Sequence, residues 1–276
     1  MKRVVKKIIL TSALLVCGCL GFMFVKIYNN QDAILFMAVP LSQDYKFSSK
    51  HEFEEIYLDG KDGGKIHALH YKTKEKPKGL VLYYHGRGSN LAGYWSEFTD
   101  DFIERGYDLL IMDYRSFGKS RGKLTQSYLL SDAINVYKYA AEQYKPADII
   151  LYGRSLGTSI ATYVASKHKV KMLILEAPYT SISDLAPGQF PFLPKSLVSS
   201  LVKYPLKTYE WIQSVKTPIH IFHGTKDKLI PYSNSVKLHS LAKNRTEVEL
   251  TTIDEGTHNT LMHHNEYQNK LDFLLK

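Results

Sequence analysis

Cysteine is scarce in this sequence: two of its 276 residues are cysteines, and both Cys17 and Cys19 lie in an apolar run near the N-terminus. Residues 28–276 therefore offer no disulfide, no thiol nucleophile and no cysteine ligand for a metal. The chain also lacks internal repeats, low-complexity tracts and any stripe of basic residues interleaved with aromatics. The last absence argues against a nucleic-acid-binding protein, in spite of a formal net charge of +9.

Acidic residues are missing from the first 31 positions, where four basic residues (positions 2, 3, 6 and 7) precede an uncharged run from Ile8 to Val25. The 18 residues of this run reach the lower limit for a membrane-spanning helix and exceed the apolar core of a typical signal peptide. No A-x-A-like cleavage site follows it. We predict a transmembrane signal anchor over residues 1–27, with a cytoplasmic N-terminus and the rest of the chain on the outer, extracytoplasmic side. Export after signal cleavage is the alternative.

The remaining length suits one folded domain preceded by a short connection. Residues 28–50 are expected to form a juxtamembrane stalk. Within this stalk, AILFMAVP is apolar enough to lie along a membrane surface or to dock on the domain. Residues 51–276 are expected to form the domain itself.

Strand and helix patterns alternate from residue 79 onward, which predicts a mainly parallel sheet with helices on both faces. Ahead of them, FEEIYLD and KIHALHY flank KDGG, a hairpin signal that adds antiparallel strands at the N-terminal edge. The sequence therefore predicts an α/β fold. In open sheets of this kind the chemistry gathers at the carboxyl ends of strands, so catalytic partners are expected in loops that follow strands.

The motif GRSLG, at residues 153–157, contains a candidate nucleophile. ADIILY precedes the motif as an apolar run suited to a buried strand, and TSIATYVASKHK follows with apolar residues at helical spacing. A serine at such a strand–turn–helix junction is exposed above the sheet, and the flanking glycines permit the tight turn. We interpret Ser155 as a nucleophile. The alternative is a simple turn with two packing glycines.

A serine hydroxyl needs a base to take its proton, and that base needs a carboxylate to orient it. Among the histidines late in the chain, His239 is predicted on a helix, and His263 and His264 fall near the start of the last helix. His258 lies in DEGTHNT, the polar loop directly after the strand TEVELTTI. We predict that His258 is the base, because this fold class requires the order nucleophile, acid, histidine.

Three carboxylates between or beside these positions compete for the role of the orienting acid. Asp227, in GTKDKLIPY, comes four residues after the strand PIHIFH ends, and it is the predicted acid. Glu176, at the end of VKMLILE, is the main alternative. Asp254 precedes His258 by four residues and is interpreted as a turn residue.

Acyl transfer also needs hydrogen-bond donors for the oxyanion that develops on the carbonyl. The N–H of Leu156, directly after the nucleophile and at a helix N-terminus, is one predicted donor. The N–H of Arg87 is the other, because the glycines of HGRGSN (residues 85–90) permit close backbone approach. We predict no cofactor and no metal, since the glycine-rich loops lack the dinucleotide and P-loop patterns and the late histidines lack zincin spacing.

Several of these segments together resemble a known family. HGRGSN, DYRSFGKSRG, GRSLG, EAPYTSISDL, HGTKDKLIPYS and GTHNT occur in an order similar to that of α/β-hydrolases, over roughly residue 50 to the end. The resemblance is strongest to single-span, membrane-anchored members, which include bacterial hydrolases of unassigned substrate and eukaryotic protein depalmitoylases. It implies an α/β-hydrolase fold over residues 51–276 and a triad of Ser155, Asp227 and His258. One departure is Arg87, where family members often carry a small or amide residue.

The segment from Ser181 to Val215 stands where lipases carry a full lid, and it is too short for an elaborate cap. We therefore expect a minimal cap and a shallow, open site. Candidate apolar walls of a substrate pocket, with plain core packing as the alternative for each, are Tyr94, Trp95, Tyr179, Phe190 and Phe192.

We expect a serine hydrolase that cleaves a carboxylic ester or thioester of a small-molecule or lipid-like acyl substrate. The apolar side chains near the opening and the membrane tether both favour such a substrate. A peptidase or amidase on the same triad is the alternative, since one fold hosts both activities. A non-catalytic binding protein on a hydrolase fold is a third hypothesis, against which an intact triad argues.

Overall fold

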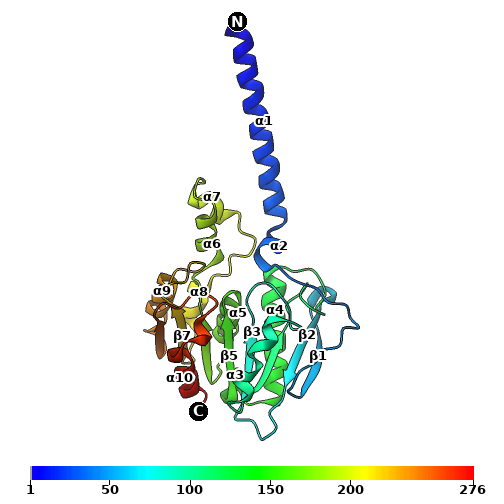
Figure 1. The fold of residues 1–276 in the computed structure, drawn as a ribbon, viewed down its shortest axis with the longest axis vertical. Coiled ribbons are helices and arrows are strands. Elements are labelled where there is room, and N and C mark those ends of the chain that lie inside the picture. Colours follow the sequence, from blue (N-terminus) through cyan, green and yellow to red (C-terminus); the bar gives the residue numbers. More distant parts are fainter. Residues whose placement is uncertain (1) are drawn as a thin grey trace.

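The structure, a computed structural model, describes residues 2–276 apart from the side chains at positions 2, 5, 7–9, 13, 14, 16, 17 and 20. Its centre is an eight-stranded sheet with the order β1-β2-β4-β3-β5-β6-β7-β8 (Figure 1). The strands are β1 (Phe53–Asp59), β2 (Lys65–Tyr71), β3 (Leu80–Tyr84), β4 (Asp108–Met112), β5 (Ile149–Arg154), β6 (Met172–Glu176), β7 (Ile219–Gly224) and β8 (Val248–Ile253). β2 runs antiparallel to β1 and β4, and the remaining neighbours are parallel. This confirms the predicted mainly parallel sheet with an antiparallel N-terminal edge.

Burial along the strands follows from their place in the sheet. Every residue of β3, β4 and β5 is buried, as expected for parallel strands with both faces covered. The edge strand β1 instead mixes half-buried and exposed positions. Short, continuous apolar runs in the sequence therefore became the central strands, and the more polar run became the edge.

Helices cover both faces of the sheet (Figure 1). The helices that contribute to these layers are α3 (Thr99–Ile103), α4 (Gln126–Gln143), α5 (Leu156–Lys167), α9 (Ser233–Ala242) and α10 (Asn265–Leu274), together with the short 3₁₀ helix η2 (Tyr94–Phe98). One apolar cluster includes side chains of α4, α5 and α9, and a second includes side chains of η2, α3 and α10. The two clusters are the two cores of the layered fold, one on each face of the sheet.

A minimal cap connects β6 to β7. It contains three short helices, α6 (Ile182–Leu185), α7 (Lys195–Ser200) and α8 (Thr208–Trp211). α6 and α7 rise from the body on the side from which the N-terminal helix projects (Figure 1). The expected absence of a large lid agrees with this short segment.

The N-terminal helix α1 (Lys2–Asn29) projects from the body, and α2 (Gln31–Phe36) follows it against the domain (Figure 1). Within the residues that the structure describes, no helix combines the length and the apolar character needed to span a membrane. The anchor predicted over residues 1–27 includes Met1 and ten side chains that lie outside the described set. The anchor therefore stays a prediction.

The apolar segment AILFMAVP docks on the domain, which was one of its two expected placements. Phe36 is fully buried, and its ring packs 4.9 Å from that of Tyr204 and 6.5 Å from that of Phe117. The segment after it pairs with the loop that follows β4 through a bridge between Pro40 and Gly118. Within the stalk expected over residues 28–50, the residues around Phe36 and Pro40 thus contact the domain.

Candidate active site

Ser155 lies in the sharp turn between β5 and α5. Its backbone angles, φ 51° and ψ −116°, fall in a region that residues with side chains rarely adopt. The flanking glycines are required by close backbone contacts. A Cβ on Gly157 would lie 1.9 Å from the carbonyl oxygen of Tyr84, and one on Gly153 would lie 2.6 Å from the carbonyl oxygen of Gly157. The motif thus holds Ser155 in a strained turn at the carboxyl end of β5.

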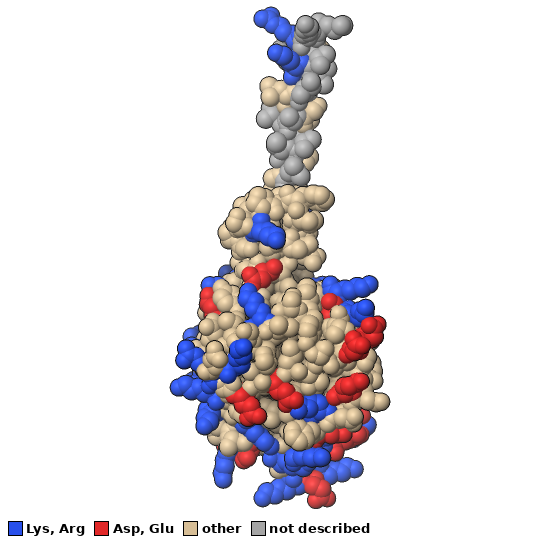
Figure 2. Space-filling view, turned by 90° about the vertical axis from the view of Figure 1, so that its left-hand side faces the viewer, with Lys and Arg blue, Asp and Glu red and all other residues tan. Residues whose placement is uncertain are grey.

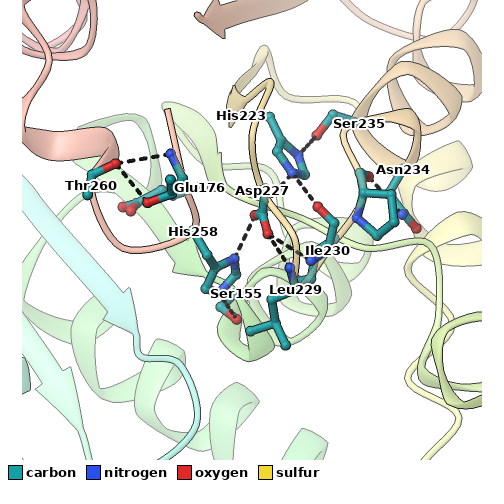
Figure 3. Close-up of polar contacts among 12 residues, drawn as sticks. Ser155, Glu176, His223, Asp227, Leu229, Ile230, Asn234, Ser235, His258 and Thr260 are labelled. Atoms are coloured by element: carbon teal, nitrogen blue, oxygen red, sulfur yellow. Dashed lines mark hydrogen bonds and ion pairs between the residues drawn. The ribbon is translucent and has the colours of Figure 1, made fainter. Parts of the chain in front are cut away.

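The side chains of Ser155, His258 and Asp227 form one hydrogen-bonded chain (Figure 3). His258 Nε2 lies 2.9 Å from Ser155 Oγ, and His258 Nδ1 lies 2.7 Å from Asp227 Oδ2. The three residues follow β5, β8 and β7, whose carboxyl ends meet at one edge of the sheet. The structure therefore brings together the three residues that the sequence predicted as nucleophile, base and acid.

Asp227 is held as a carboxylate by its surroundings. Its side chain is fully buried, and its Oδ1 accepts hydrogen bonds from the backbone N–H groups of Leu229 and Ile230, both at 2.8 Å. Burial alone would raise the pKa of this carboxyl, but hydrogen bonds from His223 and His258 outweigh burial, and the pKa lies below its ordinary value. An ionised Asp227 fixes the imidazole with Nδ1–H toward the acid and Nε2 ready to accept the serine proton.

The sequence matches a hydrolase family over a segment that contains Ser155. The profile of the family described as "Serine aminopeptidase, S33" matches residues 75–211. YfhR of Escherichia coli K12 is 29% identical over 216 residues, which cover 74% of this chain and 73% of YfhR. The α/β hydrolase domain-containing protein WAV2 of Arabidopsis thaliana is 28% identical, with 70% of this chain and 68% of WAV2 covered.

Solved structures share the fold. The esterase Pf2001 of Pyrococcus furiosus superposes with a TM-score of 0.69 at 20% identity, over 86% of this chain and 98% of the esterase. Acetyl xylan esterase 1 of a Thermoanaerobacterium species superposes with a TM-score of 0.67 at 17% identity, over 91% and 92% of the two chains. The chain has the α/β-hydrolase fold. The mainly parallel sheet with an antiparallel N-terminal edge agrees with the fold that the resemblance implied.

His223 is a site residue of this α/β-hydrolase that the sequence analysis missed. Its Nε2 lies 2.9 Å from the carbonyl oxygen of Ile230 and 3.3 Å from Asp227 Oδ2, and its Nδ1 lies 2.6 Å from Ser235 Oγ (Figure 3). The ring is fully buried and supports the acid from the side opposite His258. The available signal was a histidine at the end of the strand PIHIFHG, four residues before the acid.

Glu176, the alternative acid, has a different place in the hydrolase. Its carboxylate lies 3.0 Å from Arg154 Nε, with both side chains almost fully buried, and accepts a 2.5 Å hydrogen bond from Tyr152. Its backbone carbonyl accepts the N–H of Ser155 at 2.8 Å. Glu176 thus holds the turn that contains Ser155 through its backbone carbonyl. Asp254, the third candidate acid, instead accepts a hydrogen bond from Thr225 in a loop.

The two predicted oxyanion donors belong to the residue after Ser155 and to the loop after β3. Leu156 is the first residue of α5, so its N–H has no intrahelical acceptor and lies at the positive end of the helix dipole. Arg87 lies in the loop after β3. This loop comes close to the nucleophile, since a Cβ placed on Gly86 would lie 3.4 Å from Ser155 Cβ. The Arg87 side chain is exposed and its Nη2 contacts Met37 Sδ at 2.6 Å.

The five candidate wall residues divide into three groups. Trp95 and Tyr179 are 5% and 1% exposed, so they pack in the core beneath the site, and the expectation that they line an open pocket is corrected. Tyr94 lines a cavity of about 570 Å³ beside the loop that carries His258. Phe190 is half-buried, and Phe192 is 98% exposed at the cap.

Within the part of the chain that the structure describes, no group of three or more His, Cys, Asp or Glu side chains is placed to hold a metal ion. The other histidines that the sequence analysis considered lie apart from the hydrogen bonds that link Ser155, His258 and Asp227. His239 is on α9, His263 is exposed in a 3₁₀ turn, and His264 precedes α10.

Proposed function

We propose that this α/β-hydrolase cleaves a carboxylic ester or thioester through an acyl-enzyme on Ser155. The observation that supports the proposal most is the hydrogen-bonded chain from Asp227 through His258 to Ser155, with distances of 2.7 and 2.9 Å. Both distances lie within hydrogen-bond reach before any substrate is bound. The serine hydroxyl therefore has a base in place to take its proton.

The reaction has two halves. Ser155 Oγ attacks the acyl carbonyl carbon as its proton moves to His258 Nε2, and the N–H groups of Arg87 and Leu156 donate to the oxyanion. The tetrahedral adduct collapses, and the leaving alkoxide or thiolate takes the proton from His258. A water molecule then gives its proton to His258 and attacks the acyl carbon. The carboxylic acid leaves, and Ser155 regains its proton.

An ester or thioester is favoured over a peptide by the solved structures, which include the esterases Pf2001, Est1E and acetyl xylan esterase 1. The specific observation in favour of a peptidase or amidase is the family profile described as a serine aminopeptidase. A non-catalytic binding protein is the third candidate. The three candidates differ in whether Ser155 reacts and in which acyl bond it cleaves.

We also propose that the hydrolase is a single-pass membrane protein, with residues 1–27 as the anchor and the domain on the outer side. The uncharged run between the basic residues and Lys26 supports the anchor. Figure 2 shows few charged side chains where the helix meets the body. Exposed apolar side chains at this end of the molecule include Ile34, Met37 and Val39, which are about half exposed, and Phe192 of the cap.

A fluorophosphonate probe tests the serine mechanism. The wild type should be labelled and Ser155→Ala should not, whereas Ser166→Ala, a serine of α5 that bonds to a backbone carbonyl, should be labelled like the wild type. Loss of the label in Ser166→Ala, or a label that persists in Ser155→Ala, would contradict the assignment. A folded wild type that takes no label would favour the binding protein.

A substrate panel distinguishes the two enzymatic candidates. p-Nitrophenyl esters of rising chain length would be compared with acyl-CoA thioesters and aminoacyl anilides under the same conditions. We expect kcat/KM to be highest for an ester or thioester. A preference for the anilides would replace the proposal with the peptidase.

A further inference from the structure

The chain between the N-terminal helix and the domain contacts the loop that carries a predicted oxyanion donor. We name residues 30–43 the connecting segment and residues 85–90 the oxyanion loop. The N–H of Gly88 donates to the carbonyl oxygen of Phe36 at 2.7 Å, and Asn90 Nδ2 donates to the carbonyl oxygen of Val39 at 2.9 Å. Two hydrogen bonds therefore join the connecting segment to the oxyanion loop.

The connecting segment is itself held by parts of the domain other than the oxyanion loop. Phe36 is fully buried and packs edge-on against Tyr204 at 4.9 Å. The carbonyl oxygen of Val39 accepts the N–H of Gly118 at 3.0 Å, and the N–H of Leu41 donates to the carbonyl oxygen of Gly118 at 2.8 Å. These contacts give the oxyanion loop a fixed support.

A second contact with the domain lies at the start of the connecting segment. Gln31 Nε2 donates to the carbonyl oxygen of Leu201 at 2.8 Å, and its Oε1 accepts the N–H of Lys203 at 2.9 Å. Both partners belong to the segment between α7 and α8, which is part of the minimal cap. The connecting segment thus reaches from the cap to the oxyanion loop.

The oxyanion loop needs such support because its backbone is strained. Gly88 and Ser89 both have positive φ, of 78° and 58°, and a non-glycine residue in that region persists only when its surroundings hold it. On its inner side, Trp95 Nε1 donates to the carbonyl oxygen of Gly88 at 2.7 Å. Gly88 is therefore held by Trp95 on one side and by Phe36 on the other.

We propose that the connecting segment is a working part of the active site, because it positions the backbone N–H of Arg87 above Ser155. The Gly88 N–H belongs to the peptide plane next to the one that carries the Arg87 N–H, so the bond to Phe36 limits rotation at Arg87. Phe36 and Asn90 are then positioning residues for oxyanion stabilisation. The inference rests on the proposed serine mechanism. It gives Phe36 and Asn90, which lie outside the triad, a role in that mechanism.

The proposal also links the N-terminal helix to catalysis. α1 ends at Asn29, and the connecting segment begins at the next residue, one position before α2 starts at Gln31. A partner protein or a membrane surface that binds α1 therefore acts on the connecting segment, which contacts the oxyanion loop of the active site.

The sharpest test is Asn90→Asp in the full chain. The aspartate keeps the size of the side chain and the oxygen that accepts the N–H of Ala92 at 2.9 Å, but it replaces the donor to Val39 with a carboxylate oxygen. We expect kcat on a p-nitrophenyl ester to fall about tenfold or more, with KM changed less than about threefold, because oxyanion contacts strengthen in the transition state. A kcat equal to that of the wild type would overturn the proposal.

A second pair of variants separates positioning from loss of stability. Phe36→Ala should lower kcat in the same way, and Phe36→Leu should recover most of it. Tyr137→Ala is the matched control, since this buried ring stacks on His168, just beyond the end of α5 opposite Ser155. Thermal unfolding midpoints of all variants would be measured together. An equal loss of kcat in Tyr137→Ala would assign the effect to general loosening and overturn the proposal.

A boronic acid that forms a tetrahedral adduct on Ser155 gives a direct measure of the oxyanion site. Its inhibition constant should rise in Asn90→Asp by a factor similar to the fall in kcat. An unchanged inhibition constant would overturn the inference and leave the proposed function standing. A folded wild type without turnover or label would overturn the proposed function itself.

Discussion

Asp227 shows how much of the chemistry is decided at single residues. One carboxylate oxygen accepts two backbone N–H groups and the other lies near two imidazoles, of His258 and His223. A buried charge with fewer partners would be costly and would take up a proton instead. The partners are therefore what keep the acid ionised, and an ionised acid keeps the base correctly oriented.

Ser155 and His258 should behave as one unit. Ser155→Ala and His258→Ala are each expected to lower kcat by roughly 10⁴-fold or more, because loss of either stops the proton transfer that makes the hydroxyl nucleophilic. The double variant should lose little more than either single variant. Steady-state kinetics on a p-nitrophenyl ester would measure this, and additive losses would show that one residue is assigned wrongly.

Asp227→Asn should reveal the stabilising effect of the carboxylate through its pH dependence. Because the folded pKa lies below the ordinary value of 3.8, ionised Asp227 stabilises the fold above that value and the stabilisation is lost as the pH falls through the folded pKa. Urea unfolding should give a wild type that is about 2–3 kcal/mol more stable than the variant at pH 5 and above.

Urea unfolding at lower pH tests the direction in which the stabilisation by Asp227 changes with pH. The difference in free energy of unfolding between wild type and Asp227→Asn should shrink as the pH falls below 3.8. A difference that is independent of pH would show that the native carboxyl is not held ionised by its partners.

At the scale of elements, the turn between β5 and α5 depends on the close approach of α5 to β3. Gly157 is the first-turn residue of α5 that touches the backbone of Tyr84, the last residue of β3. This contact sets the height of Ser155 above the sheet and places the oxyanion loop, which directly follows β3, beside the nucleophile. α5 and β3 can therefore pack this closely because Gly157 has no side chain.

Gly157→Ala tests this contact. The added Cβ would lie 1.9 Å from a carbonyl oxygen of Tyr84, so α5 must move away. We expect a loss of about 1–3 kcal/mol in unfolding free energy together with a large fall in fluorophosphonate labelling. Gly188→Ala is the control, because a Cβ there meets nothing within 4 Å. Wild-type labelling of Gly157→Ala would contradict the argument.

At the scale of the whole molecule, the hydrolase consists of a charged body and a projecting N-terminal helix (Figure 2). Basic and acidic side chains are spread over the visible face of the body, and few occur where the helix joins it. The cap helices α6 and α7 rise at the same end (Figure 1). This arrangement would place the active-site edge of the sheet toward a membrane that holds the helix.

Membrane attachment can be measured on the full chain. We expect the protein to sediment with membranes and to resist alkaline carbonate extraction. Leu15→Arg combined with Cys19→Arg should release it, because each arginine near the middle of the run opposes insertion by about 2.5–3.5 kcal/mol. A wild type that is extracted by carbonate would contradict the anchor, and an intact mass shortened at the N-terminus would indicate signal cleavage.

Most of the fold and three residues of the site follow from local sequence patterns. Continuous apolar runs such as LVLYY predict buried parallel strands, and the last helix, expected to start near His263 and His264, begins at Asn265 in the structure. The choice of Ser155, Asp227 and His258 follows from the rule that chemistry gathers after strands and from the order nucleophile, acid, histidine. Local periodicity encodes which face of an element is buried, so these features need no knowledge of distant neighbours.

Tertiary structure alone decided which distant groups meet. The Arg154–Glu176 pair beneath Ser155 and the bond from Gly88 to Phe36 join positions that no sequence spacing relates. Packing also decided that Trp95 and Tyr179 are core residues. The sequence determined the elements and the order of the triad because these depend on neighbours along the chain. The support of the acid and of the oxyanion loop depends on neighbours in space, which exist once the sheet and its helices have packed.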